Sequence, residues 1–388
     1  MTSVGTKKEN IESMAVTVDM SPVSLSPELE KAPEPLLSRL NNFLHSNIYV
    51  YLITYYLFWL GFWLIMPLAG FFTMLGFGLY DLFTAKGFRK PCGPVLITGT
   101  SSGFGLDLTL QLAAQGWKVY ACVRKGADLA PFARYPNVKG LIMDVTNEEQ
   151  IRAAIATVEA ECPEGLYALV NNAGYEQYGT TDWCGLDYFK LHMDVNYYGP
   201  IRLTKTALPL LKKHGKAGKE GARIININST SGLLPGLPLK GGYSASKHAA
   251  EAWSNSLRQE MRRFNVEITV INPSWHATRC ALPPKDKLLE SFRAAPPEVQ
   301  ADYGEEYVLE AADEAYNGRQ WFTWNPENVG RVMLWAVTAE KYRPQYLVGM
   351  DARFVNMPFL ALPRRIMNKL EDGAPFAKMI PAGAVDRD

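Results

Sequence analysis

The sequence lacks the cysteine pattern of metal-binding and disulfide-rich proteins. Its five cysteines include no C-x2-C pair and show no pairing with histidine, and they are odd in number. An excess of one charge is also missing, because 40 basic and 39 acidic residues leave a net charge of +1. We therefore expect no metal site, thiols that are free and mostly buried, and no nucleic-acid partner.

Charged residues are absent from residues 48–80, a run that is apolar and crowded with aromatic side chains. A membrane-spanning helix needs about 20 apolar residues, so we predict a membrane anchor over residues 47–83. It would be one helix with an interfacial extension, or a hairpin bent at Met66–Pro67 and Gly70. Basic residues just after this run slightly outnumber those just before it, which favours a catalytic domain on the cytosolic side. We expect the membrane to be that of the endoplasmic reticulum.

The two ends of the chain differ from the rest in composition. Residues 1–46 are polar and rich in Pro, Ser and Glu, which predicts a disordered, solvent-facing tail. Residues 351–388 form a C-terminal extension whose segment 354–370 combines apolar residues with a basic cluster. This segment would either lie on the membrane surface or pack against the catalytic domain.

Between these ends, apolar strand-like runs alternate with amphipathic helical stretches, which predicts one α/β domain over residues 90–350. We expect a Rossmann-like, doubly wound, seven-stranded parallel sheet. Residues 279–322 form a long connection without strong periodicity, and we interpret them as a substrate lid. The expected strands are 94–98, 118–123, 139–143, 166–170, 222–228, 266–272 and 345–348.

The first strand leads through a glycine-rich loop, TGTSSGFG at 98–105, into an apolar-periodic helix. Gly99 would allow the tight turn, Gly103 would let phosphates approach the backbone, and Gly105 would let the helix pack close to the strand. Backbone N–H groups at such a helix start form a seat for pyrophosphate. An ordinary Gly/Ser turn has the same composition, so the loop alone is weak evidence.

The second strand ends at Arg124, where a dinucleotide-binding fold meets the adenosine ribose. A guanidinium pairs with the 2′-phosphate of NADP, whereas an acidic residue would favour NAD. Arg124 therefore favours NADP as the cofactor, with NAD as the alternative. Further cofactor contacts are expected where the third and fourth strands end, from Asp144, Val145, Asn172, Ala173 and Gly174.

A tyrosine and a lysine four residues apart, Tyr243 and Lys247, begin a predicted helix and share one face of it. A neighbouring ammonium favours the phenolate form of tyrosine, so Tyr243 would be a usable proton donor and acceptor. The same spacing recurs at Tyr135 and Lys139, but Pro136 there prevents a helix.

Two further residues are candidates for the same site. Ser229 ends the fifth strand, and its hydroxyl would hydrogen-bond the substrate oxygen, although Thr230 and Ser231 compete for that role. Asn196 lies in a helix predicted over 187–211. Because Pro200 has no N–H, the carbonyl of Asn196 would be left to hold a water that bridges to Lys247, or the proline would only kink the helix.

Six motifs in this order resemble the short-chain dehydrogenase/reductase family of the classical type: TGTSSGFG, NNAG at 171–174, Asn196, Ser229, YSASK at 243–247 and NPSWHAT at 272–278. The membrane-associated retinol, hydroxysteroid and 3-hydroxybutyrate dehydrogenases are the most similar branch. The resemblance implies a catalytic tetrad and subunits that pair as a homodimer or homotetramer. The implied tetrad consists of Asn196, Ser229, Tyr243 and Lys247. The resemblance also implies cofactor contacts from Ser102, Phe104, Tyr243, Lys247, Pro273 and Thr278.

The chain departs from the family pattern in three places. The spacing from Ser229 to Tyr243 is one residue longer than usual, so either the loop LLPGLPLKGG carries an insertion or Thr230 is the catalytic hydroxyl. Ser274 and Trp275 stand where glycine commonly follows proline, which puts the local backbone in doubt and would narrow the nicotinamide pocket. Arg124 fits NADP, whereas several relatives in this branch use NAD.

We expect a membrane-anchored NADP(H)-dependent oxidoreductase that moves a hydride between nicotinamide and a carbonyl or alcohol carbon. Its partners would be membrane lipid and a lipophilic substrate, such as a retinoid, a steroid, or a keto or hydroxy lipid. An NAD-dependent alcohol dehydrogenase is the alternative enzyme. A nucleotide-binding membrane scaffold that has lost turnover is the alternative outside enzymes.

Overall fold

The computed structural model describes residues 56, 61, 87–218, 220–236, 238–276, 285–317, 324–341 and 343–352. Its centre is a seven-stranded sheet in which every paired strand is parallel. All seven strands that the sequence predicts are confirmed, within two residues at their ends. They are β1 (Val95–Thr98), β2 (Val119–Val123), β3 (Val138–Ile142), β4 (Ala168–Asn171), β5 (Ala222–Ile227), β6 (Val266–Pro273) and β7 (Gln345–Val348).

The strand order is β3-β2-β1-β4-β5-β6-β7, so the chain reverses its direction of travel across the sheet between β1 and β4. In an open α/β sheet the carboxyl ends of the strands at such a switch point form a crevice that binds ligands. The doubly wound topology that the sequence predicts is confirmed, and it places the glycine-rich loop after β1 directly beside the segment that follows β4.

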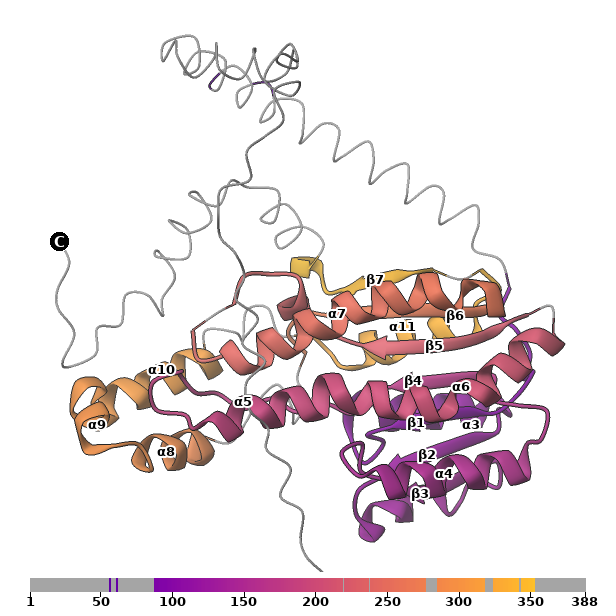
Figure 1. Cartoon of the computed structure of the whole chain (residues 1–388), viewed down its shortest axis with the longest axis horizontal. Coiled ribbons are helices and arrows are strands. Elements are labelled where there is room, and N and C mark those ends of the chain that lie inside the picture. Colours follow the sequence, from indigo (N-terminus) through magenta and orange to yellow (C-terminus); the bar gives the residue numbers. More distant parts are fainter. Residues whose placement is uncertain are drawn as a thin grey trace, which may run out of the picture. The chain divides into compact units, whose positions relative to one another are not determined.

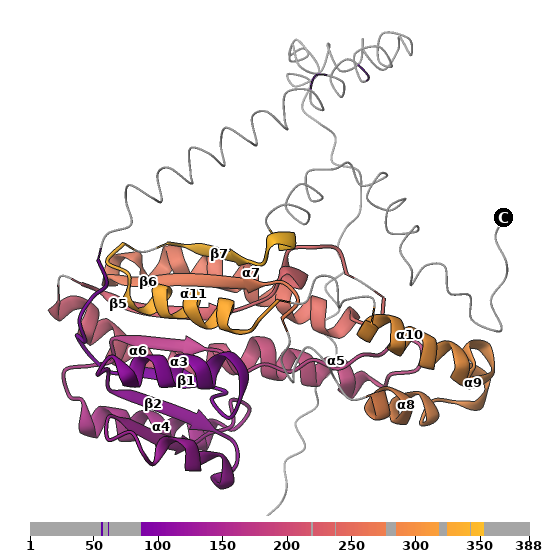
Figure 2. The ribbon, with the colours of Figure 1, turned by 180° about the vertical axis from the view of Figure 1, so that it is seen from behind.

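Helices cover both faces of the sheet. α4 (Glu148–Glu161), α6 (Gly199–Ala217) and α7 (Gly241–Met261) pack on one face, and α3 (Gly103–Ala114) and α11 (Glu327–Thr338) pack on the other (Figures 1 and 2). Successive strand residues alternate between the two cores: Leu96 belongs to the first, and Val95 and Ile97 belong to the second. Burial on both faces is why these strands read as continuous apolar runs.

The end of α11 is bonded to side chains from the middle of the sheet. Arg223 of β5 is 1% exposed and donates to the carbonyls of Ala336 (2.9 Å) and Val337 (3.0 Å). The hydroxyl of Tyr167, just before β4, also donates to the carbonyl of Val337, at 2.6 Å. These donors satisfy terminal carbonyls that have no partner within the helix.

The helix predicted over 187–211 is divided in the structure. α5 (Leu186–Met193) passes through a π-helical turn, Asp194–Tyr198, into α6. The N–H of Gly199 bonds the carbonyl of Asp194, five residues back, just before Pro200. Because Pro200 donates no hydrogen bond, the α-helical ladder is broken here and the wider turn takes its place.

Three short helices, α8 (Lys285–Arg293), α9 (Pro297–Tyr303) and α10 (Glu305–Asn317), occupy the described part of the segment interpreted as a lid. They lie together at one end of the domain, drawn in orange (Figures 1 and 2). Phe292 and Val308 pack in one cluster with Tyr178 and Trp183, which follow β4, and with Leu239, which precedes α7. The segment therefore contacts both loops that flank the predicted site.

The predictions for residues 1–46, for the anchor at 47–83, apart from positions 56 and 61, and for 353–388 lie outside the described residues. Among the residues that are described, no helix is both long enough and apolar enough to cross a membrane.

Candidate active site

The glycine-rich loop has the backbone that its sequence predicts. Gly99 and Gly103 have φ values of 67° and 60°, a region that favours glycine. A Cβ on Gly99 would lie 2.9 Å from the Cα of Ala173, and a Cβ on Gly105 would lie 2.5 Å from the carbonyl oxygen of Gly99. Gly105 therefore packs α3 against the end of β1.

The N-terminus of α3 is open toward the cleft. Ser102 is the N-cap residue, but its side chain makes no capping hydrogen bond, and the first turn contains no acidic residue. Backbone N–H groups at a helix start need partners, and the helix dipole favours an anion there. The loop and the start of α3 therefore fit the pyrophosphate of a dinucleotide.

Thr98, the last residue of β1, joins this loop to the segment after β4. Its hydroxyl accepts from the N–H groups of Asn172 (2.9 Å) and Ala173 (2.8 Å). The amide of Asn172 donates back to the carbonyl of Thr98 at 2.8 Å. These bonds hold the two sides of the crevice at a fixed separation.

Two cations stand at the far end of the cleft, where β2 ends. Arg124 and Lys125 are both exposed and both line the cleft. Asp144, at the end of β3, accepts hydrogen bonds from the N–H (2.9 Å) and hydroxyl (2.7 Å) of Thr146 through Oδ1. The positive end of the cleft suits a phosphorylated ribose.

Tyr243 and Lys247 lie one turn apart on α7 and are both buried, at 8% and 5% exposure. The Lys247 Nζ lies 5.7 Å from the centroid of the Tyr243 ring and donates to the carbonyl of Ile227 at 3.2 Å. Helical spacing thus brings the ammonium to the tyrosine, whereas Lys139 of the second Tyr/Lys copy lies on strand β3 and pairs with Glu161.

Three hydroxyl residues follow β5, and all three line the cleft: Ser229, Thr230 and Ser231. Ser229 has an extended backbone, and its Oγ accepts from the N–H of Ser231 at 3.1 Å. This bond orients the Ser229 oxygen and leaves its proton for donation. Thr230 begins a 3-10 turn, Thr230–Gly232, and is 7% exposed.

Asn196 lies in the π-helical turn and is 2% exposed, but it does not line the cleft. Its side chain accepts from the N–H of Tyr175 (2.8 Å) and donates to the carbonyl of Tyr175 (2.8 Å) and the hydroxyl of Ser246 (3.0 Å). The side-chain amide therefore joins the segment after β4 to α7, a contact that reasoning from the backbone carbonyl alone did not predict.

The residues after Pro273 resolve the doubt about the local backbone. Ser274 N bonds the carbonyl of Val348 at 2.9 Å, and its hydroxyl donates to Asp351 at 2.7 Å. Gly349, with φ 117°, makes room for this serine, because a Cβ there would lie 2.0 Å from the Ser274 Oγ. Gly349, which directly follows β7, thus leaves the space that the Ser274 side chain occupies. Thr278 lies outside the described residues.

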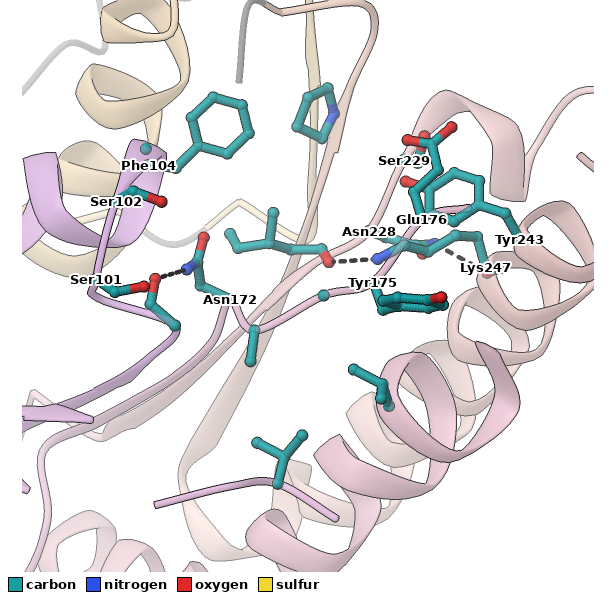
Figure 3. A pocket seen from close by; sticks show the side chains of 18 of the residues that line it. Ser101, Ser102, Phe104, Asn172, Tyr175, Glu176, Asn228, Ser229, Tyr243 and Lys247 are labelled. Carbon is teal, nitrogen blue, oxygen red and sulfur yellow. Dashed lines mark hydrogen bonds between the residues drawn. The ribbon is translucent and has the colours of Figure 1, made fainter. Parts of the chain in front are cut away.

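These elements enclose a cleft of about 680 Å³, large enough for an extended ligand. Figure 3 shows Ser101, Ser102 and Phe104 on one side, and Ser229, Tyr243 and Lys247 on the other, with Asn172 between them. Most of the predicted cofactor and catalytic residues line it: Gly99, Ser102, Gly103, Phe104, Arg124, Asp144, Val145, Asn172, Ala173, Gly174, Ser229, Tyr243, Lys247 and Pro273.

Sequence reasoning missed three cleft residues. Glu176 and Lys240 form a buried ion pair, and nothing in the local sequence links positions so far apart. His276 is 2% exposed, with Nδ1 3.1 Å from the carbonyl of Ser274. Its buried Nε2 has no hydrogen-bond partner within the described part of the chain. Its place in NPSWHAT was the available signal.

Burial sets the protonation of several groups around the cleft. It lowers the pKa of His276 and that of His192, whose ring lies 6.4 Å from the Tyr243 ring between centroids, so burial favours the neutral form of both imidazoles. It raises the pKa of the Cys122 thiol to about 12, so this cleft residue is no nucleophile at neutral pH. Among the described residues, no group of three or more His, Cys, Asp or Glu side chains could hold a metal ion.

Comparison with known proteins adds to this geometry. The profile of the short chain dehydrogenase family matches residues 94–286. Human retinol dehydrogenase 16 is 32% identical over 285 residues, covering 71% of this chain and 86% of the relative. Rat 17-beta-hydroxysteroid dehydrogenase type 6 is 31% identical over 283 residues, with the same coverage. The crystal structure of a short-chain dehydrogenase from Streptomyces avermitilis superposes with a TM-score of 0.57 at 25% identity, covering 73% of this chain and 97% of that one.

Proposed function

Because the chain belongs to the short-chain dehydrogenase/reductase family, in its retinol and hydroxysteroid dehydrogenase branch, we propose that it is a membrane-anchored, NADP(H)-dependent oxidoreductase acting on a lipophilic carbonyl or alcohol. The observation that carries this proposal is the placement of Tyr243, Lys247 and Ser229 at one end of a cleft whose other end holds a glycine-rich loop and an uncapped helix start.

In the proposed reaction Tyr243 is the general acid and base. In reduction its hydroxyl gives a proton to the substrate oxygen, and in oxidation its phenolate takes that proton back. Ser229 donates a hydrogen bond to the same oxygen as charge develops on it, and Lys247 stabilises the phenolate. A bound nicotinamide would supply or accept the hydride at the substrate carbon.

Asn196 is the fourth residue of the proposed catalytic set, and its side chain acts through its neighbours because it does not line the cleft. Its side chain fixes Tyr175, which lines the cleft, and Ser246, which lies one residue before Lys247. In this way one buried amide holds two walls of the site in register. The structure supports a positioning role for the side chain beside the carbonyl role that the broken helix suggests.

The preference for NADP is proposed from Arg124, with support from Lys125 beside it. Both cations lie at the adenosine end of the cleft. A 2′-phosphate would meet two positive charges there, and the carboxylate that would accept a bond from the 2′-hydroxyl of NAD is absent at the Arg124 position. NADP use would also favour reduction in the cell, where that pool is kept reduced.

The lipophilic substrate and the membrane are proposed together. An anchor at 47–83 would keep the catalytic domain at a membrane surface, which we propose is the cytosolic face of the endoplasmic reticulum, where retinoids, steroids and keto lipids partition. α8 to α10 would form the lid over the substrate, since Lys287 of α8 lines the cleft. We also propose a homodimer or homotetramer that pairs through the long helices α6 and α7.

The experiment uses the full chain, purified in detergent. NADPH and NADH binding are measured by fluorescence for the wild type and Arg124→Asp, and retinaldehyde, ketosteroids and keto lipids are then screened with the preferred cofactor. We expect tighter NADPH binding that reverses in the variant, and turnover that falls at least about 100-fold in Tyr243→Phe. Tighter NADH binding by the wild type would instead indicate the alcohol dehydrogenase, and binding without turnover would indicate a scaffold.

A further inference from the structure

A buried ion pair forms part of the cleft wall. Lys240 immediately precedes α7, Glu176 follows β4, and the Lys240 ammonium contacts Glu176 Oε1. Their side chains are 2% and 4% exposed, and both residues line the cleft beside Tyr243. Removing two charges from water is unfavourable, so such a pair in a substrate cleft calls for a physical reason.

Aromatic rings surround the Lys240 ammonium. Its Nζ lies 3.7 Å from the ring centroid of Trp275, 5.2 Å from that of Tyr178 and 5.4 Å from that of Tyr243. Two of the three departures from the family pattern meet here. Lys240 belongs to the longer loop between Ser229 and Tyr243, and Trp275 stands in the stretch after Pro273.

Two ammonium groups therefore lie at nearly equal distance from the Tyr243 ring centroid, Lys240 at 5.4 Å and Lys247 at 5.7 Å. The ring of His192 of α5 also lies near that of Tyr243, 6.4 Å away between centroids, and burial lowers the pKa of this histidine. Further charged or titratable residues that line the cleft include Glu176, Tyr175, His276 and Lys287.

A positive charge at this range favours a phenolate, and a negative charge disfavours it. Taking the role of Tyr243 from the proposed function, we propose that Lys240 is a second cation that acts on the acidity of Tyr243, and that Glu176 limits how much of its charge the phenol meets. Lys240 and Glu176 are positioning residues in this scheme, because they act through Tyr243.

The pair also joins the segment after β4 to the loop before α7, and Lys240 adds the contact with Trp275. A purely structural role would use the same contacts. The two roles differ in one measurable respect. If the pair is only structural, removing either charge changes the stability of the fold and has no consistent effect on the ionisation of Tyr243. If the pair acts electrostatically, removing the Glu176 charge and removing the Lys240 charge shift that ionisation in opposite directions.

The experiment titrates Tyr243 without any substrate. Tyrosinate absorbance near 295 nm is followed against pH for the full chain and for the same protein carrying Tyr243→Phe, and the difference isolates one tyrosine. The pair of measurements is repeated with Glu176→Gln, with Lys240→Met, and with both substitutions together. Glu148→Gln is the matched control, since it removes the acid of an exposed ion pair with Arg152 on α4.

We expect Glu176→Gln to lower the midpoint of Tyr243 by about 1 pH unit and Lys240→Met to raise it by a similar amount. The double variant should return close to the wild type, because the two charges oppose one another, and the control should not move. Equal midpoints in all proteins, or shifts of the same sign in the two single variants, would overturn the inference.

Either single variant leaves a charge buried without its partner and could fail to fold. Glu176→Asp then replaces Glu176→Gln, because the shorter side chain keeps the negative charge but moves it away from Lys240. It must lower the midpoint of Tyr243 by less than the shift expected for Glu176→Gln. The titration is also independent of turnover. If Tyr243→Phe stayed active the proposed function would fail, while the signed shifts would still report the pairing.

Discussion

The side chain of Asn196 is bonded to both backbone polar atoms of Tyr175, accepting from its N–H at 2.8 Å and donating to its carbonyl at 2.8 Å. The segment after β4 has left the sheet at this point, and the Asn196 amide supplies the two hydrogen bonds that a neighbouring strand would otherwise make. The π-helical turn before Pro200 holds this amide in place, so an irregularity of one helix fixes a wall of the cleft.

Replacing Asn196 with alanine should therefore loosen that wall. The N–H and carbonyl of Tyr175 would each lose the hydrogen bond to Asn196, and a bond lost at a group shielded from water costs about 1–3 kcal/mol. We expect the free energy of unfolding, measured with urea, to fall by about 2–3 kcal/mol. Asn255→Ala on the exposed side of α7 is the control and should change it by less than about 0.5 kcal/mol. A loss no larger than that of the control would show that the amide is dispensable.

Gly99 and Gly116 provide a matched pair of glycines. Both have positive φ, 67° and 82°, but only Gly99 would place a Cβ against backbone, that of Ala173. Gly116→Ala should cost about 1–2 kcal/mol for the left-handed backbone alone. Gly99→Ala should cost more, and should weaken NADPH binding at least about tenfold because the loop must move. Unchanged NADPH binding in Gly99→Ala would count against this loop as the phosphate seat.

Thr98→Val tests the bridge between β1 and β4. Valine has nearly the same shape but cannot accept from the N–H groups of Asn172 and Ala173, so we expect a loss of about 2–3 kcal/mol in unfolding experiments. Thr109→Val on α3 is the comparison, because its hydroxyl only donates to the carbonyl of Gly105. Its loss should be about 1 kcal/mol or less, and equal losses would contradict the assignment.

Burial of histidines predicts a stability that depends on pH. Burial lowers the pKa of His192, His214 and His276 below 6.5 in the folded chain. The unfolded chain takes up protons below about 6.5 that the folded chain refuses, so stability is complete above that pH and declines as pH falls through the folded values. Each histidine contributes at most about 1.4 kcal/mol per pH unit.

The measurement is urea unfolding between pH 7.5 and pH 5. His192→Gln should show a shallower decline than the wild type, whereas His248→Gln, at an exposed position of α7, should follow the wild type. A decline of the same steepness in His192→Gln would mean that other groups dominate the acid response.

Much of the fold could be predicted because it depends on local patterns. Strands buried on both faces, such as β1 and β5, appear in the sequence as continuous apolar runs, and the glycines of the loop after β1 have the conformations that their spacing indicates. The shared helix face of Tyr243 and Lys247 could also be predicted, because side chains four residues apart lie on one face of a helix.

Other features depend on contacts between distant segments. Glu176 and Lys240 are ordinary residues in sequence and meet only when the segment after β4 reaches the start of α7. The helices α8 to α10 are short, and two of them follow prolines, so periodicity did not separate them from a loop. Pro200 indicated a disturbed helix, but it did not indicate that the disturbance takes the form of a π-helical turn, in which the N–H of Gly199 bonds the carbonyl of Asp194.

The bonds from Arg223 and Tyr167 to the end of α11 have a consequence for the order of events in synthesis. These partners are separated by 113 residues or more. Until α11 has left the ribosome, the growing chain therefore leaves the Arg223 guanidinium and half of one sheet face exposed. Domains of this size expose apolar surface in such partly made states. We expect nascent chains that stop before residue 327 to be held by chaperones, and the catalytic domain to become protease-resistant only once α11 is present.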